Sequence, residues 1–242
     1  MMQRARRISL GLFTTLAIVG FAGQAPAADE RFEISSIKAV KPTLVSTAAA
    51  LLQGDIAKAK AAFEAYDSAW NGIEVYIDTR SKPMYEKIEL DLQARITKGL
   101  NEPTPDVAKL RADLQEMIAK YDEAIAMVTN AAPLNPLFDD VARLRIVRAH
   151  LREVNPALKV GNIAKARKSY EAFDANWDSI EDLIKARSAD AYVAIEKGMI
   201  QIEQALMPDK PDVAQVTALV TAVNTQYNAT LALIVKEARG AK

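Results

Sequence analysis

The sequence predicts an all-α protein made of a tandem duplication of one antiparallel four-helix-bundle module. Three observations predict it: apolar residues recur at alternate spacings of three and four, one long segment occurs twice, and no stretch alternates with a period of two. Of the 242 residues, 50% are apolar and 26% are charged. This composition is enough for a packed core and a solvated surface.

The first 27 residues have the three parts of a secretory signal peptide. Three arginines within the first seven residues precede an apolar run over 8–23, and Ala25-Pro26-Ala27 forms a small-residue cleavage site. The run is shorter than the roughly 20 residues that a membrane-spanning helix needs. We therefore expect residues 1–27 to be removed by cleavage and the product to be periplasmic. The sequence leaves open whether the Sec or the Tat pathway exports it.

The charge balance makes nucleic acid an unexpected partner. The whole chain has 31 basic and 31 acidic residues, and removal of the signal peptide takes away three arginines and no acid, which leaves a net charge of −3. There is no basic stripe of the kind that binds a phosphate backbone. No later segment looks long and apolar enough to span a bilayer, so we expect no membrane span after cleavage.

The residue types present argue against most enzymes. Zero cysteines and one histidine exclude disulfide frameworks, zinc–cysteine sites, iron–sulfur clusters, multi-histidine sites and thiol catalysis. Neither a glycine-rich phosphate loop nor a G-x-S-x-G or H-E-x-x-H motif occurs. Hydrolysis by a carboxylate pair is the remaining enzymatic option, but such a pair needs a cleft that short loops do not shape. We expect a protein that is not an enzyme.

The duplication is visible by direct comparison. Residues 56–89 and 163–196 align without a gap at an offset of 107, and 16 of the 34 pairs are identical. The similarity extends outward, which predicts one helical repeat over 33–130 and a second over 134–238. Each copy has the length of a small domain.

The predicted helices follow from the apolar stripe that the three-and-four spacing forms along each helix, called the seam below, and from the residues that end each helix. Gly54-Asp55 and Gly161-Asn162 offer a C-cap followed by an N-cap, and prolines follow the third helix of each copy. The seam of the second helix is Ile56, Ala59, Phe63, Tyr66, Trp70, Ile73 and Ile77. The predicted helices are 34–53, 55–80, 83–100, 105–129, 136–160, 162–187, 189–207 and 211–238.

Two glutamates next to the seam recur in both copies. Glu74 and Glu89 lie on neighbouring predicted helices, each seven or eight residues from the turn near 81–82. At a rise of ~1.5 Å per residue, both lie about 11 Å from that turn. Their carboxylates therefore can meet at one level, and Glu181 and Glu196 repeat the arrangement.

Two adjacent carboxylates repel unless a cation, a shared proton or a basic side chain neutralises them. Hard cations such as iron, calcium, magnesium or manganese prefer oxygen ligands. Arg80 and Arg187 also recur in both copies and offer a purely structural salt-bridge network instead. A third option is that the carboxylates point outward, and helical spacing does not separate the three.

A weaker candidate site surrounds the single histidine. His150 and Glu153 form an H-x-x-E spacing, which puts two ligand types about one helical turn apart. On this motif and the two predicted bundles, the chain resembles imelysin-like periplasmic iron-uptake proteins, whose signature is G-x-H-x-x-E. Here Arg148 stands in place of the glycine, and the other copy has Thr43 in place of His150.

The paired Tyr/Trp…Glu helices also resemble the extracytoplasmic helical domains of iron permeases. The R-E-x-x-E motif of those permeases and their membrane helices are not in this sequence. Both resemblances imply a role in iron uptake, iron as the cofactor or cargo, and an envelope transport complex as partner.

The leading hypothesis is therefore an exported, non-enzymatic protein that binds or helps deliver a cation, with iron favoured by the resemblance. Its metal ligands are expected among Glu74, Glu89, Glu181, Glu196, His150 and Glu153. The alternative is a periplasmic adaptor or homo-oligomer in which the carboxylates are purely structural.

Overall fold

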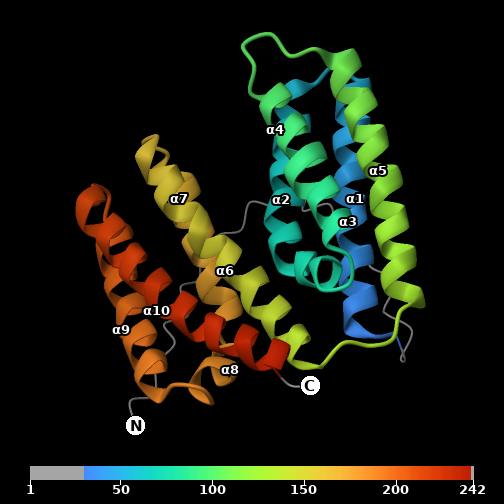
Figure 1. The fold of residues 1–242 in the computed structure, drawn as a ribbon. Helices are drawn as coiled ribbons and strands as arrows, with labels where there is room; N and C mark the ends of the chain where they lie inside the picture. Colours follow the sequence, from blue (N-terminus) through green and yellow to red (C-terminus); the bar gives the residue numbers. More distant parts are fainter. Residues whose placement is uncertain (1–29, 241–242) are drawn as a thin grey trace. The chain divides into compact units, whose positions relative to one another are not determined.

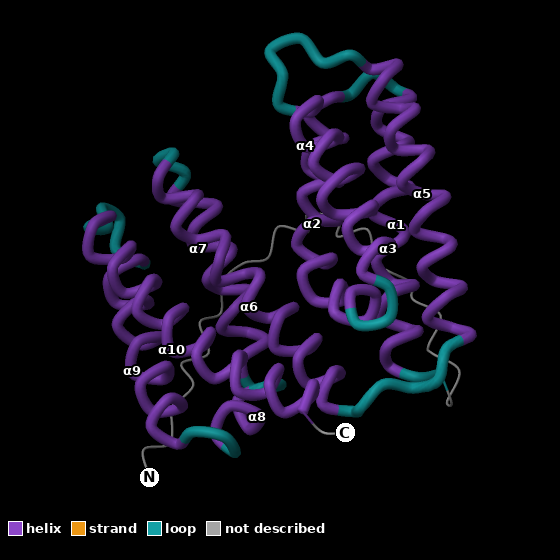
Figure 2. Tube along the Cα trace, viewed as in Figure 1, coloured by secondary structure: helices purple, strands orange, loops and turns teal. Residues whose placement is uncertain are grey.

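The protein is all-α, as predicted. A computed structural model describes residues 30–240, and within that range the chain forms helices joined by turns and loops, with no strand (Figure 2). The predicted signal peptide at 1–27 lies outside the described residues.

The helices of the first half lie close to the predicted ranges. The third predicted helix, 83–100, is a continuous run whose seven central residues form a π-helix between two α-helical segments. The elements are α1 (Phe32–Leu52), α2 (Ile56–Asp78), α3 (Lys82–Glu86), the π-helix η1 (Lys87–Gln93), α4 (Ala94–Leu100) and α5 (Val107–Asn130).

In the second half, one predicted helix is interrupted. The elements are α6 (Leu137–Lys159), α7 (Ile163–Trp177), α8 (Glu181–Lys185), α9 (Ala189–Leu206) and α10 (Val213–Gly240). The prediction of a single helix over 162–187 is wrong at 178–180. The Asn176 amide and the Ser179 hydroxyl bond to the backbone carbonyls of residues 172 and 176. Such side chains compete with the helical hydrogen bonds.

The predicted caps are present where α2 and α7 begin. Gly54 and Gly161 have φ of 70° and 72°, a conformation that glycine adopts without a Cβ clash. Asp55 accepts a hydrogen bond from the Lys58 amide at 2.9 Å, and Asn162 accepts one from the Lys165 amide at 3.0 Å. These side chains satisfy backbone donors at each helix start.

The same helix pairs are in contact in both halves. In the first half α1 packs against α2 and α5, and α5 packs against η1 and α4; in the second half α6 packs against α7 and α10, and α10 packs against α9 (Figure 1). The helices α2 and α6 join the halves, and Arg31–Lys242 forms one compact unit. The repeat boundaries at 33–130 and 134–238 remain predictions from the sequence.

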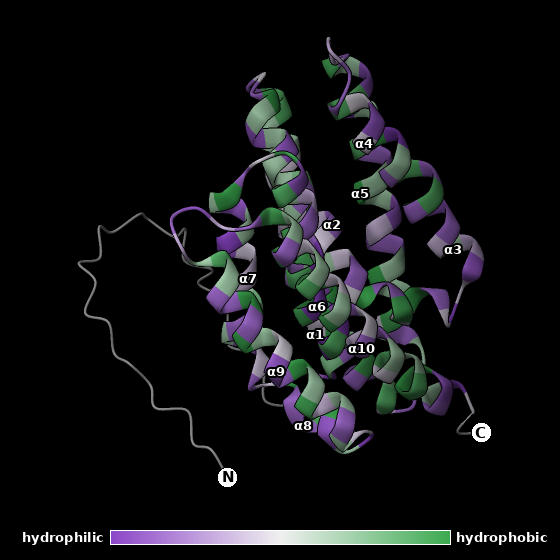
Figure 3. Ribbon diagram, turned by 90° about the vertical axis from the view of Figure 1, so that its left-hand side faces the viewer, coloured by the Kyte–Doolittle hydropathy of each residue, from purple (hydrophilic) through white to green (hydrophobic). Residues whose placement is uncertain are grey.

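The aromatic residues of the seam form the core, as their spacing predicts. Tyr66 stacks on Trp70 at 5.9 Å, and Phe173 contacts Trp177 at the same distance. Hydrophobic and hydrophilic residues are interspersed along the helices (Figure 3), and the longer helices α1, α2, α5, α6, α7, α9 and α10 all bury apolar residues.

Gly72 makes the close contact between α2 and α6 possible. A Cβ at this position would lie 2.2 Å from Cγ1 of Ile146, which is well inside van der Waals contact. The corresponding residue of the second copy is Ser179. The α2–α6 contact therefore depends on the missing side chain of Gly72.

By length and composition alone, α10 meets the requirement for a membrane-spanning helix. This finding bears only loosely on the expectation of no membrane span, because a helix of a protein core passes the same test. Residues Val216, Val220, Tyr227 and Ile234 of α10 are buried, and α10 packs against α6 and α9. The helix α10 therefore buries one face against its two neighbours.

Candidate functional site

The carboxyl groups of Glu74 and Glu89 meet between two adjacent helical segments. Glu74 lies on α2 and Glu89 on η1, and the two side chains are hydrogen-bonded to each other. The indole Nε1 of Trp70 donates to Oε2 of Glu89 at 2.8 Å, and Tyr85 is also hydrogen-bonded to this carboxylate. The sequence placed the two glutamates at one level, and the structure brings them together.

An arginine from the second half reaches the same pair. Nη1 of Arg145, on α6, donates to Oε1 of Glu74 at 2.6 Å, and each side chain is only 18% exposed. Arg145 was not among the candidates because the repeat gave no signal for it: the aligned residue of the first copy is Lys38. The contact joins α2 to α6.

Burial raises the pKa of Glu74 to about 8. The charge of Arg145 acts in the opposite direction, and the hydrogen bond and charge of Glu89 raise the pKa further. Two carboxyl groups that are hydrogen-bonded to each other share a proton more readily than they both ionise. The pair therefore holds a proton in the neutral range.

The aligned glutamates of the second half are Glu181, at the start of α8, and Glu196, on α9. Nε1 of Trp177 donates to Oε1 of Glu196 at 2.5 Å. Desolvation raises the pKa of Glu181, and the charges of Glu196, Asp178 and Asp182 raise it further. Glu181 and Glu196 thus lie in a region of concentrated negative charge.

The two recurring arginines have other partners. Arg80 donates to Glu33 at 2.6 Å, and Arg187 lies 3.3 Å from Glu237. Among the described residues, the arginine that contacts Glu74 is therefore Arg145 and not Arg80.

The halves differ in the side chains around the pairs. Tyr66 and Gln93 of the first copy align with Phe173 and Ile200 of the second. The hydroxyl of Tyr66 and Oε1 of Gln93 are buried and have no hydrogen-bond partner among the described residues. Sequence reasoning treated Tyr66 only as a core residue, although the Tyr/Phe difference was a signal of polarity.

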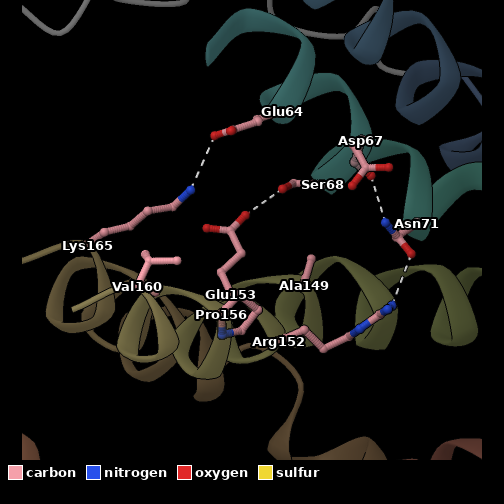
Figure 4. Close-up of a pocket in the computed structure, with 11 residues that line it drawn as sticks. Glu64, Asp67, Ser68, Asn71, Ala149, Arg152, Glu153, Pro156, Val160 and Lys165 are labelled. Atoms are coloured by element: carbon pink, nitrogen blue, oxygen red, sulfur yellow. Dashed lines mark hydrogen bonds and ion pairs between the residues drawn. The ribbon is translucent and has the colours of Figure 1, made fainter. Parts of the chain in front are cut away.

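Glu153, from the weaker candidate, connects three helices. It accepts hydrogen bonds from Ser68 of α2 at 2.6 Å and from Ser169 of α7 at 3.1 Å. It lines a hollow of about 320 Å³ between α2 and α6 (Figure 4), where Lys165 pairs with Glu64 at 3.2 Å. Each carboxylate oxygen of Glu153 thus accepts one serine hydrogen bond.

His150 lines a neighbouring hollow of about 640 Å³ between α2, α6 and α7, which Glu153 also lines. Within residues 30–240, no group of three or more His, Cys, Asp or Glu side chains is positioned to hold a metal ion. The acidic candidates are therefore pairs, and any further ligand must come from another residue type or from solvent.

Comparison of the chain with protein-family models, with curated proteins and with solved structures gave no match in any of the three. The geometry of the two carboxylate pairs is thus the basis for a functional assignment.

Proposed function

We propose that this is an exported, non-enzymatic protein that binds a cation, iron above all, through the pairs Glu74/Glu89 and Glu181/Glu196. The observation that carries the proposal is the hydrogen-bonded pair Glu74/Glu89 in the first half, together with a tryptophan Nε1 that donates to Glu89 there and to Glu196 in the second half. Convergent carboxylates attract a proton or a hard cation. Iron is favoured by the resemblance to iron-uptake proteins.

Each pair has one oriented carboxylate. The indole N–H that bonds one oxygen of Glu89 or Glu196 fixes the plane of that carboxylate. A ligand that is held in place by a second hydrogen bond loses less conformational freedom when it binds a metal. We therefore expect such a pair to bind a cation more tightly than two flexible carboxylates on the surface would.

The two pairs are expected to differ in their affinity for cations. Arg145 already neutralises one charge in the first pair. Around Glu181, three further acids, Glu196, Asp178 and Asp182, add negative charge. Divalent cations are therefore expected to bind first at the second pair.

Calorimetric titration with Fe(III), supplied as its nitrilotriacetate chelate, and with Mn(II), Ca(II) and Cu(II) tests this function. We expect the wild type to show saturable binding. The double variant Glu181→Gln/Glu196→Gln is expected to bind divalent ions more weakly, and replacement of all four glutamates by glutamine is expected to abolish binding. Glu102→Gln, in an exposed loop, is the matched control and is expected to bind like the wild type. Heat no greater than that of the buffer for every ion would exclude the proposal.

A further inference from the structure

A contact between α6 and α10 in the second half has a charged counterpart in the first half. In the first half, Nζ of Lys41 on α1 lies 2.6 Å from Oδ1 of Asp122 on α5, so a cation and a carboxylate neutralise each other. The residue that aligns with Lys41 is Arg148. Its Nη1 donates to Oδ1 of Asn228, on α10, at 2.7 Å. In the second half the partner of the cation is thus a neutral amide.

A conserved tyrosine contact shows that the two places are structurally equivalent. Tyr121, which precedes the aspartate, donates its hydroxyl to the Ile37 carbonyl at 2.7 Å. Tyr227, which precedes the asparagine, donates its hydroxyl to the Leu144 carbonyl at the same distance. The two carbonyls belong to residues that align between the halves. Asn228 therefore stands where the first half has its aspartate.

No carboxylate within residues 30–240 forms an ion pair with Arg148. The side chain is half-buried, and its Nε is buried without a hydrogen-bond partner in that range. Burial lowers the pKa of Arg148, and the positive charges of Arg152 and Arg145 lower it further. Burying a charge without a partner costs free energy. The guanidinium of Arg148 therefore lacks a negative counterpart.

A second guanidinium follows one turn later on the same helix. Arg152 is four residues after Arg148, a spacing that makes side chains neighbours on a helix surface. Its Nη1 donates to Oδ1 of Asn71 on α2 at 3.1 Å, which is again a neutral amide (Figure 4). The aligned residue of the first half is Val45. Compared with the first half, this place has one more positive charge and one fewer negative charge.

The free polar groups at this place are donors. The oxygen of the Asn228 amide already accepts from Arg148, so the amide has its N–H groups left, and Nη2 of Arg148 has no partner within the described residues. An aspartate would present a second acceptor oxygen instead. The fork of a guanidinium matches the oxygens of carboxylates and phosphates. Asn228 and Arg152 are exposed, so a solute can reach these donors.

We propose that Arg148, Arg152 and Asn228 form a binding site for a divalent oxyanion, of which phosphate is the simplest. The bound anion supplies the negative charge that Asp122 supplies to Lys41 in the first half. Two guanidiniums without an acid match a double negative charge, whereas a monocarboxylate balances only one of them. Binding is non-covalent. The site uses none of the four glutamates and does not depend on the proposed function.

The test is calorimetric titration of the metal-free protein with inorganic phosphate and with acetate, at pH 8 and low salt. We expect saturable phosphate binding that is weaker by about tenfold or more in Arg148→Gln and in Arg152→Gln, because each loses a charge-assisted hydrogen bond. Arg111→Gln, which changes an exposed arginine of α5, is the matched control and is expected to bind like the wild type. No phosphate binding, or equal binding in Arg148→Gln, would overturn the proposal. Acetate that binds as tightly as phosphate would overturn the assignment to a divalent anion.

A second variant restores the charge pattern of the first half without removing a cation. Asn228→Asp is expected to form an ion pair with Arg148 and so to raise the melting temperature of the protein in the absence of phosphate. Phosphate is expected to raise the melting temperature of the wild type and to leave that of the variant unchanged. An Asn228→Asp protein that binds phosphate as tightly as the wild type would contradict the proposal.

Discussion

Arg145 of α6 donates a hydrogen bond of 2.6 Å to Glu74 of α2, and so the charge of a residue in the second half balances a carboxylate in the first. The contact is mostly buried, with 18% of each side chain exposed. The Glu74/Glu89 pair is therefore connected to the packing of α2 against α6, which holds the two halves together.

The first prediction is a pH-dependent stability that comes from Glu74. Its pKa of about 8 in the folded protein exceeds the ordinary 4.5, so folding retains a proton that the unfolded chain releases. This stabilisation is fully present below pH 4.5 and is lost as the pH rises through about 8. The slope is at most about 1.4 kcal/mol per pH unit.

Urea denaturation of the wild type and of Glu74→Gln between pH 5 and pH 8 measures this effect. The glutamine variant is expected to show a smaller decrease in the free energy of unfolding over that range. Parallel curves for the two proteins would show that Glu74 titrates normally.

The second prediction concerns the loss of Arg145. Arg145→Met leaves Glu74 buried without its partner, which at pH 8 is expected to cost about 2–4 kcal/mol of unfolding free energy. At pH 5 the loss is smaller because Glu74 is protonated. The double variant Arg145→Met/Glu74→Gln is expected to recover most of the stability.

Chemical denaturation at both pH values checks this prediction. Arg239→Ala provides the control, because Arg239 is 58% exposed and lies 3.5 Å from Asp78. Such a surface pair contributes about 0–1 kcal/mol. An equal effect of the two single variants at pH 8 would contradict the role given to Arg145.

The third prediction is that Tyr66→Phe stabilises the metal-free protein. The change removes a buried hydroxyl that has no hydrogen-bond partner within residues 30–240, and such a group costs about 1–3 kcal/mol. We expect a higher melting temperature in the presence of a chelator. Tyr121→Phe loses a real hydrogen bond to the Ile37 carbonyl and is expected to melt lower. A lower melting temperature for Tyr66→Phe would show that its hydroxyl is satisfied in solution.

The fourth prediction addresses the contact between α2 and α6. Gly72→Ala introduces a Cβ that would lie 2.2 Å from Ile146, and this overpacking is expected to cost about 1–3 kcal/mol. Adding Ile146→Ala removes the clashing atoms. A thermodynamic cycle of the two changes should therefore give a favourable coupling energy, and simple additivity would argue against close packing there.

The sequence alone predicts the helix ends and the equal distance of Glu74 and Glu89 from the turn between their helices. Gly54 and Asp55 end one helix and start the next through short-range hydrogen bonds and backbone conformation, which the residue types specify. Glu74 and Glu89 are equally far from one turn, so their approach follows from helix geometry.

The remaining features depend on contacts between distant residues or on small local differences. Arg145 is 71 residues from Glu74, and no pattern along the chain links them. The π-helix has an ordinary helical sequence, and the corresponding residues of the second copy are α-helical. The sequence does contain a signal for the break after Trp177. Asn176 and Ser179 stand where the first half has Ala69 and Gly72, and such polar side chains compete with helical hydrogen bonds.

The most direct test of the central claim is the number of ferric ions bound per chain, measured by elemental analysis after equilibrium dialysis. We predict two ions for the wild type, one for either double glutamine variant, Glu74→Gln/Glu89→Gln or Glu181→Gln/Glu196→Gln, and none when all four glutamates are replaced. An iron content that does not change when these four residues are replaced, or no bound iron in the wild type, would contradict the account.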